Sequence, residues 1–155
     1  MSGVAVFPHP SKETVPLALR ANVEHNRVLQ EQVVVMAIVT LPVPRVPEAD
    51  RNEVDALGYA KDGIIHVTTY FGYMETPKVR DALALLDANE TEGPIAVDEA
   101  SYFLSKLELI KGSAPTMASW RKSLFIATSY TTADAAAYFG LPSDRTVVMG
   151  SRIEV

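Results

Sequence analysis

Residues 24–40 read EHNRVLQEQVVVMAIVT, a charged approach that passes without proline or glycine into an apolar run. The segment 33–41 is rich in valine and carries no charged side chain. A strand that is apolar on both faces is normally covered on both sides, as the central strands of α/β sheets are. We therefore expect a central strand over 33–41.

The residues before this strand have the pattern of a strand and then a helix. Residues 4–7 read VAVF and are followed by two prolines, which suits a short first strand. Between positions 15 and 25 the apolar residues recur at helical spacing, so we predict a helix there. Asn26 is the expected end of this helix because asparagine tolerates the left-handed conformation.

The middle of the chain has the pattern of a loop followed by a β-hairpin. Three prolines between 42 and 47 predict an exposed loop, and the mixed charges over 43–62, Arg51 among them, indicate a solvated segment. The hairpin is expected to have a first strand over 54–59, a turn over 61–63 and a return strand over 64–71.

Alternation along the return strand divides its residues between two faces. Ile65, Val67 and Phe71 form the predicted core face, and the opposite face carries His66. A half-exposed histidine on a covered sheet and a histidine that lines a pocket or an interface are both compatible with this position.

The second half of the chain continues the alternation of helices and strands. A helix is predicted within 75–87, capped by Thr76, and a further strand pair or one bent strand over 102–110. A second helix is expected over 115–139, ended by Gly140, and a last strand over 147–154.

The order of these elements predicts the fold class. Strands and helices interleave around one hairpin, and no linker or repeat divides residues 1–155. We therefore expect a single α/β domain, with a layered mixed β-sheet flanked by about three to four helices.

Composition excludes several classes of function. The net charge is −5 and the 14 Lys and Arg residues are scattered, which argues against a nucleic-acid partner. No apolar run approaches the roughly 20 residues of a membrane-spanning helix, so we expect no membrane insertion of this segment. Without cysteine, a phosphate-binding glycine loop or a serine nucleophile motif, the sequence predicts no catalytic residue, no cofactor and no enzyme.

The candidate ligand-binding residues are polar side chains around the quoted stretch. The histidines have no metal-ligand spacing, so no metal site is predicted. Asn22 and His25 stand three residues apart on one helix edge, with Arg27 close by. This corner is either a ligand site, together with His66, or a structural junction whose donors satisfy the free carbonyls of the helix end.

Six segments in order carry a resemblance to a known family. They are HNRVLQEQVVVMAIVT (25–40), VPRVPEADR (43–51), YFGYMETPKV (70–79), SYFLSK (101–106), MASWRKSLF (117–125) and FGLPSDRTVVMGSRIEV (139–155). Together the segments resemble the cytosolic C-terminal domain of bacterial Kup-type members of the KUP/HAK/KT potassium uptake family. One departure lies after SYFLS, where Lys106, Leu107 and Glu108 stand in place of the Arg-Glu and threonine usual in the family.

The resemblance implies a function that the motifs do not reveal. It implies a regulatory and assembly domain of a potassium:proton symporter in the cell membrane, placed on the cytoplasmic side. The implied partners are its own transmembrane domain, a second copy in a homodimer, and cyclic di-AMP or another nucleotide. The alternatives are a purely structural dimerisation domain and a nucleotide sensor.

Overall fold

The computed structural model describes residues 2–9, 13–57, 61–91, 93–110 and 139–154, with the side chains of 106–110 and 151–154 left aside. Short 3-10 or π-helical turns are labelled η. The elements are β1 (Val4–Pro8), α1 (Leu17–Ala21), η1 (Asn22–Asn26), β2 (Gln32–Leu41), η2 (Glu48–Asp50), β3 (Asn52–Asp55), β4 (Ile64–Gly72), α2 (Val79–Ala84), η3 (Val97–Glu99), β5 (Ser101–Ile110), η4 (Ser143–Arg145) and β6 (Thr146–Glu154).

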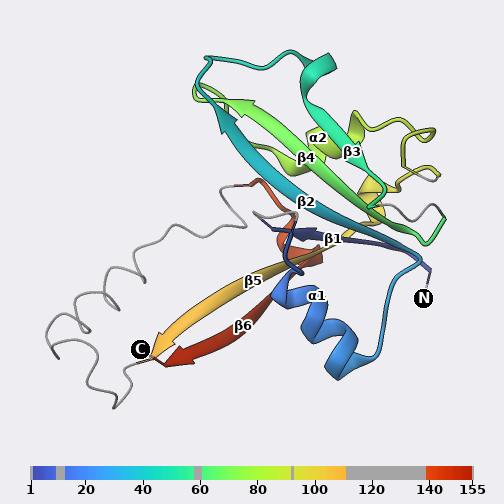
Figure 1. Ribbon diagram of the computed structural model, residues 1–155, viewed down its shortest axis with the longest axis vertical. Helices are drawn as coiled ribbons and strands as arrows, with labels where there is room; N and C mark the ends of the chain where they lie inside the picture. Colours follow the sequence, from blue (N-terminus) through green and yellow to red (C-terminus); the bar gives the residue numbers. More distant parts are fainter. Residues whose placement is uncertain (1, 10–12, 58–60, 92, 111–138, 155) are drawn as a thin grey trace, which may run out of the picture.

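The strands form one six-stranded sheet in the order β3-β4-β2-β1-β5-β6 (Figure 1). β3 runs antiparallel to β4, and the other neighbours are parallel. The predicted mixed α/β sheet with one hairpin is confirmed. β2 lies inside it between β1 and β4, as its apolar sequence indicated.

Alternate residues of the central strands enter two separate cores. Val6 and Val34 face α2, whereas Phe7 and Val35 face α1. The rings of Phe7 and Phe103 are stacked with their centroids 5.0 Å apart. Because both faces are apolar, the pattern of β1 and β2 shows no simple in-out alternation.

The hairpin differs from its prediction in the position of the first strand. β3 covers Asn52–Asp55 rather than 54–59, and Asp55 pairs with His66 on β4. Ile65, Val67 and Phe71 are buried, as predicted. His66 is only 1% exposed, so the expectation of a half-exposed histidine was wrong. Its neighbours on the same face of β4, Thr68 and Tyr70, are only partly buried.

The two described helices differ in detail from their predictions. α1 continues directly into the π-helical turn η1, and Arg27 rather than Asn26 takes the left-handed conformation, with φ of 52°. α2 begins at Val79 after Lys78, so Thr76 does not cap it. In the described ranges the α-helices are α1 and α2. The predicted helix over 115–139 falls almost entirely outside these ranges.

The C-terminal half confirms two predictions and decides between two alternatives. Residues 101–110 form one strand rather than a pair. Gly140 has a positive φ of 62°, and Leu141 after it is buried in the core on the α2 side. The chain then enters β6, close to the predicted 147–154.

Candidate functional site at the carboxyl edge

One candidate surface lies where the parallel strands β2 and β4 end, which we call the carboxyl edge. There the loop 42–47 runs beside the turn after β4. The amide of Tyr73 donates to the carbonyl of Val43 at 2.9 Å, and Met74 donates to Pro44 at 3.1 Å. A Cβ on Gly72 would lie 2.3 Å from the Pro44 carbonyl oxygen, so this approach requires glycine.

An ion pair that is largely shielded from solvent holds the same two segments together. Arg51 is 8% exposed and donates from both terminal nitrogens to Glu75, at 2.7 Å to Oε1 and 3.1 Å to Oε2. Its remaining bonds go to the carbonyls of Val46 at 2.8 Å and Tyr70 at 3.0 Å. The guanidinium carbon also lies 4.7 Å from the centre of the Phe71 ring.

Glu75 is the acceptor that joins the loop to the turn. Its Oε2 accepts from the amides of Gly72 at 2.6 Å and Val46 at 3.0 Å, besides Arg51. The bonds from Arg51, followed by the Gly72 amide, lower the pKa of Glu75 to about 2 against the opposing effect of burial. The Arg51–Glu75 pair and its hydrogen bonds therefore join the loop 42–47 to the turn after β4 as a charged clamp.

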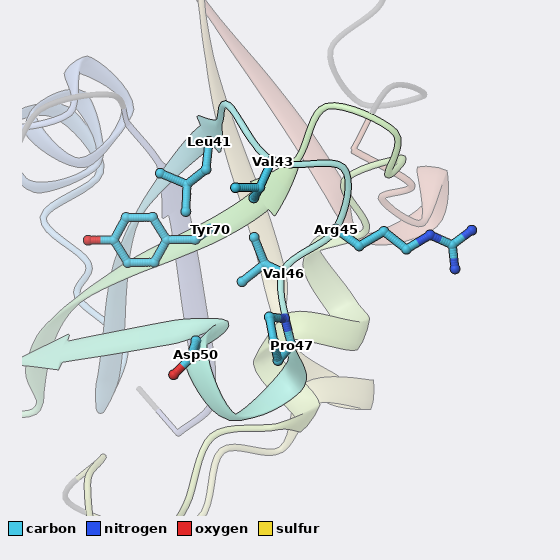
Figure 2. A pocket seen from close by; sticks show the side chains of 7 residues that line it. All are labelled: Leu41, Val43, Arg45, Val46, Pro47, Asp50 and Tyr70. Carbon is cyan, nitrogen blue, oxygen red and sulfur yellow. The ribbon is translucent and has the colours of Figure 1, made fainter.

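Beside this clamp opens a shallow pocket of about 370 Å³ (Figure 2). Its lining comes from β2, β4, the loop 42–47 and η2: Leu41, Val43, Arg45, Val46, Pro47, Asp50 and Tyr70. Figure 2 shows the aliphatic side chains and the Tyr70 ring around the pocket, while the guanidinium of Arg45 points away from it. The Tyr70 hydroxyl donates to Glu53 at 2.9 Å. The pocket thus offers an apolar contact surface with charges at its rim.

A second, more polar pocket of about 810 Å³ lies at the opposite edge, where β2 and β4 begin. Its lining includes Glu31, Lys61, Asp62 and Glu90. Within the described ranges no group of His, Asp or Glu side chains is placed to hold a metal ion.

The structure separates the residues predicted to bind a ligand. Asn22 is 4% exposed in η1, and its Oδ1 accepts from Asn26 at 2.8 Å rather than from His25. His25 and Arg27 are exposed at the end of η1, and His66 is buried in the sheet. None of Asn22, His25, Arg27 and His66 is among the described residues that line either pocket.

Sequence reasoning missed the clamp. Arg51 was assigned to a solvated charged segment, whereas its side chain is buried. Its partner Glu75 lies 24 positions along the chain, so no local spacing joins the two. The one usable signal was indirect, since VPRVPEADR and YFGYMETPKV both belong to the resemblance and contain the two partners.

Comparison with known proteins identifies the family. The profile of the K+ potassium transporter C-terminal domain matches residues 2–155. This chain belongs to that family. The Kup-type resemblance read from the sequence is therefore confirmed.

Relatives of this K+ transporter C-terminal domain are much longer than the chain. A "Probable potassium transport system protein Kup" from Rhodococcus jostii is 71% identical over 153 residues, which are 99% of this chain and 23% of that protein. Proteins of the same name from an Anaeromyxobacter species and Cutibacterium acnes are 38% and 39% identical, over 99% and 97% of this chain and 23% and 24% of their own lengths. The chain thus spans less than a quarter of these relatives, and no solved structure matches it.

The described residues were also examined for helices that could span a membrane. No helix among them is both long enough and apolar enough to cross a bilayer.

Proposed function

We propose that this chain is the regulatory and assembly domain of a potassium:proton symporter, positioned on the cytoplasmic side of the cell membrane. The observation that carries the proposal is the match of nearly the whole chain to a potassium transporter C-terminal domain. Relatives named as Kup proteins contain this domain as less than a quarter of their length. Ion translocation is then the task of the remaining part, and this domain has no enzymatic role.

A regulatory domain alters transport only if it contacts the rest of the transporter differently in two states. Such a contact needs a surface that keeps its shape. The apolar pocket meets this requirement because the clamp bonds both backbone groups of Val46, which lines the pocket. The amide of Val46 donates to Glu75, and its carbonyl accepts from Arg51. We propose that the transmembrane domain of the same protein docks on this pocket.

Substitution of Val43 by aspartate tests this docking. Val43 is 40% exposed at the pocket, so a charge there disrupts an apolar contact with the docked transmembrane domain but leaves the core intact. In the full-length transporter we expect potassium uptake per transporter to change at least about fivefold, the lower end of typical coupling between sites. The matched control is Leu85→Asp, which alters a residue that is 44% exposed at the end of α2 and outside the pocket.

Uptake is measured in a bacterial strain that lacks its own potassium uptake systems, with the amount of transporter in the membrane quantified in parallel. Equal uptake by the wild type and both variants excludes docking at the pocket. Removal of the whole domain with no effect on uptake or on membrane abundance contradicts both regulation and assembly. A fall in abundance alone supports the purely structural alternative.

The strand order offers a position for a second candidate function, the binding of a nucleotide. From β1 the chain proceeds to β2 and β4 on one side and to β5 and β6 on the other, so the order reverses between β1 and β5. In open α/β sheets ligands bind outside the carboxyl ends of the strands at this point. His9 lies there, with its Nε2 2.7 Å from the hydroxyl of Thr14. A cyclic di-AMP sensor is the form of this alternative that the family resemblance supports.

A thermal-shift panel with cyclic di-AMP, AMP, ATP and potassium chloride separates sensing from a purely structural role. A ligand present at 100 times its dissociation constant stabilises the fold by about 2.7 kcal/mol. Stabilisation by a nucleotide that His9→Ala weakens supports a sensor at the β1–β5 position. The absence of any shift in a folded sample removes the nucleotide alternative and leaves the docking proposal to the uptake experiment.

A further inference from the structure

The turn after β4 carries two large exposed side chains. Tyr73 is 62% exposed, and Met74 is 66% exposed, the highest value for a large hydrophobic side chain in the described ranges. Their amides bond to the carbonyls of Val43 and Pro44, so the turn lies against the proline-rich loop. Val43 is 40% exposed, and Pro44 is exposed as well. We call these four residues, together with Arg45, the edge patch.

The edge patch lies at one extremity of the molecule and is held in place there. Figure 1 shows β2 and β4 ending near the top of the view, at one end of the longest axis. Glu75 accepts from the amides of Gly72 and Val46, which flank the two segments of the patch in the sequence. A projecting surface can meet a flat partner without obstruction by the rest of the domain. Because the clamp already orders the patch, contact with a partner costs little further entropy.

The charges around the patch indicate the chemistry of such a partner. Arg45 is exposed, and no other residue of the edge patch is charged. The nearest acids in the sequence are Glu75, which the clamp neutralises, and Glu48 and Asp50 in η2. Figure 2 shows the guanidinium of Arg45 and the carboxylate of Asp50 on opposite sides of the pocket. The chain as a whole has a net charge of −5, so an anionic surface would be met through a patch without acids.

We propose that the edge patch contacts the anionic lipid headgroups of the membrane, with Tyr73 and Met74 in the interface and Arg45 paired with lipid phosphate. Tyrosine is enriched at membrane–water interfaces because it combines an apolar ring with a polar hydroxyl. The contact lies at the level of the headgroups and is not a membrane span. The inference goes beyond docking on the pocket, and it rests on the proposed function for the place of the domain beside a membrane.

A contact of this size is weak for a free domain but sufficient for a tethered one. Even a single fatty acyl chain gives only reversible membrane binding. A linker to a membrane-embedded part, however, raises the effective concentration to the order of millimolar. The patch would therefore orient the domain rather than anchor it. Because Val43 belongs to both the patch and the pocket, this orientation turns the pocket towards the membrane.

Sedimentation of the 155-residue chain with sucrose-loaded vesicles, over a series of lipid concentrations, measures the contact. We expect the wild type to partition onto vesicles that contain phosphatidylglycerol at least about fivefold more strongly than onto pure phosphatidylcholine. The double variant Tyr73→Ser, Met74→Ser should lower partitioning onto the anionic vesicles at least about tenfold, since it removes the apolar contact. Arg45→Gln should remove most of the preference for the anionic lipid.

The matched control is the double variant Val15→Ser, Leu85→Ser. Its two side chains are 62% and 44% exposed and lie outside the edge patch. It should partition as the wild type does. Circular dichroism verifies that each variant is folded.

A fluorescent label gives a second readout, because the chain has no cysteine of its own. A nitrobenzoxadiazole group attached to Met74→Cys should brighten on anionic vesicles as it leaves water. The same group attached to Leu85→Cys should not.

A wild type that does not partition onto anionic vesicles at any lipid concentration overturns the proposal. So does a Tyr73→Ser, Met74→Ser variant of unchanged partitioning, or a control variant that loses as much. Equal partitioning onto both lipids, or a label that brightens at position 85 but not at 74, refutes the assignment to anionic headgroups.

A protein partner at the same patch gives a different result. Tyr73→Ser, Met74→Ser would then change potassium uptake by the full-length transporter, while the wild-type domain would not partition onto vesicles. That outcome overturns the lipid contact. The vesicles contain no transporter, so this test and the uptake test with Val43→Asp can fail separately.

Discussion

Glu75→Gln tests whether the ion pair with Arg51 holds the carboxyl edge together. Glutamine keeps the size of the side chain but removes its charge and replaces one accepting oxygen with a donating amide. The carboxylate of Glu75 accepts from Arg51 through both oxygens, and from two backbone amides as well. The substitution leaves the guanidinium of Arg51, which is 8% exposed, without a counter-charge.

Two estimates of the cost agree. The pKa of Glu75 falls from 4.5 to about 2 in the fold, which corresponds to about 3 kcal/mol in favour of the ionised form. The side chain is 18% exposed, so solvent screens the interaction only slightly. Removal of one partner from a buried pair costs about 3–5 kcal/mol. We therefore expect the free energy of unfolding to fall by about 3 kcal/mol at pH 7.

The pH dependence provides a sharper signature than the loss itself. Because the pKa of Glu75 is lower in the folded than in the unfolded chain, its contribution is present above pH 4.5 and is lost as the pH falls towards 2. The difference between wild type and Glu75→Gln should therefore shrink below pH 4.5. A neutral side chain at position 75 has no proton to gain.

Urea unfolding followed by circular dichroism, at several pH values from 7 to 3, measures this difference. Glu48→Gln is the control, because Glu48 is exposed in η2 and a surface substitution changes stability by less than about 0.5 kcal/mol. A Glu75→Gln variant within about 0.5 kcal/mol of the wild type at pH 7 would refute the clamp. A larger loss that stays constant down to pH 3 would assign it to packing rather than charge.

Two further substitutions test contacts near this edge by the same urea assay. Gly72→Ala forces a Cβ to within 2.3 Å of the Pro44 carbonyl oxygen and should cost about 2 kcal/mol or more, whereas Gly150→Ala meets nothing within 4 Å and should be neutral. Equal stability of the two glycine variants would contradict the close approach. Asn52→Ala removes a 2.7 Å hydrogen bond from β3 to the carbonyl of Ala82 and should cost about 1–3 kcal/mol, and an unchanged midpoint would show that this bond contributes nothing.

The elements that sequence reasoning located well are those whose signal is local. The strand over 33–41 was predictable because nearly every residue in it is apolar, and the structure places β2 inside the sheet. The hairpin was predicted two residues too late. Its first residue, Asn52, is polar and looks like part of a loop, yet its side-chain amide donates to the carbonyl of Ala82 and its Oδ1 accepts from the Thr69 hydroxyl. Those partners are supplied by tertiary structure, which local periodicity cannot reveal.

The clamp lay beyond sequence reasoning for a related reason. Arginine is mostly exposed in proteins, so Arg51 within a run of mixed charges is assigned to solvent on any statistical argument. Its burial depends on a bidentate partner and two carbonyls that only the fold brings together. His66 shows the opposite error, since alternation placed it correctly on the face away from Val67 but could not show that its side chain is almost fully buried.

The pocket at the carboxyl edge follows from an unusual connection in the sheet. Parallel neighbours such as β2 and β4 are ordinarily joined by a crossover helix. Here the connection is the loop 42–47, η2 and the antiparallel strand β3. Leu41 and Tyr70 therefore meet a proline-rich loop rather than the side of a helix, and the space between them remains open as the pocket. Because a loop alone would not keep this shape, the Arg51–Glu75 pair supplies the rigidity that a helix otherwise gives.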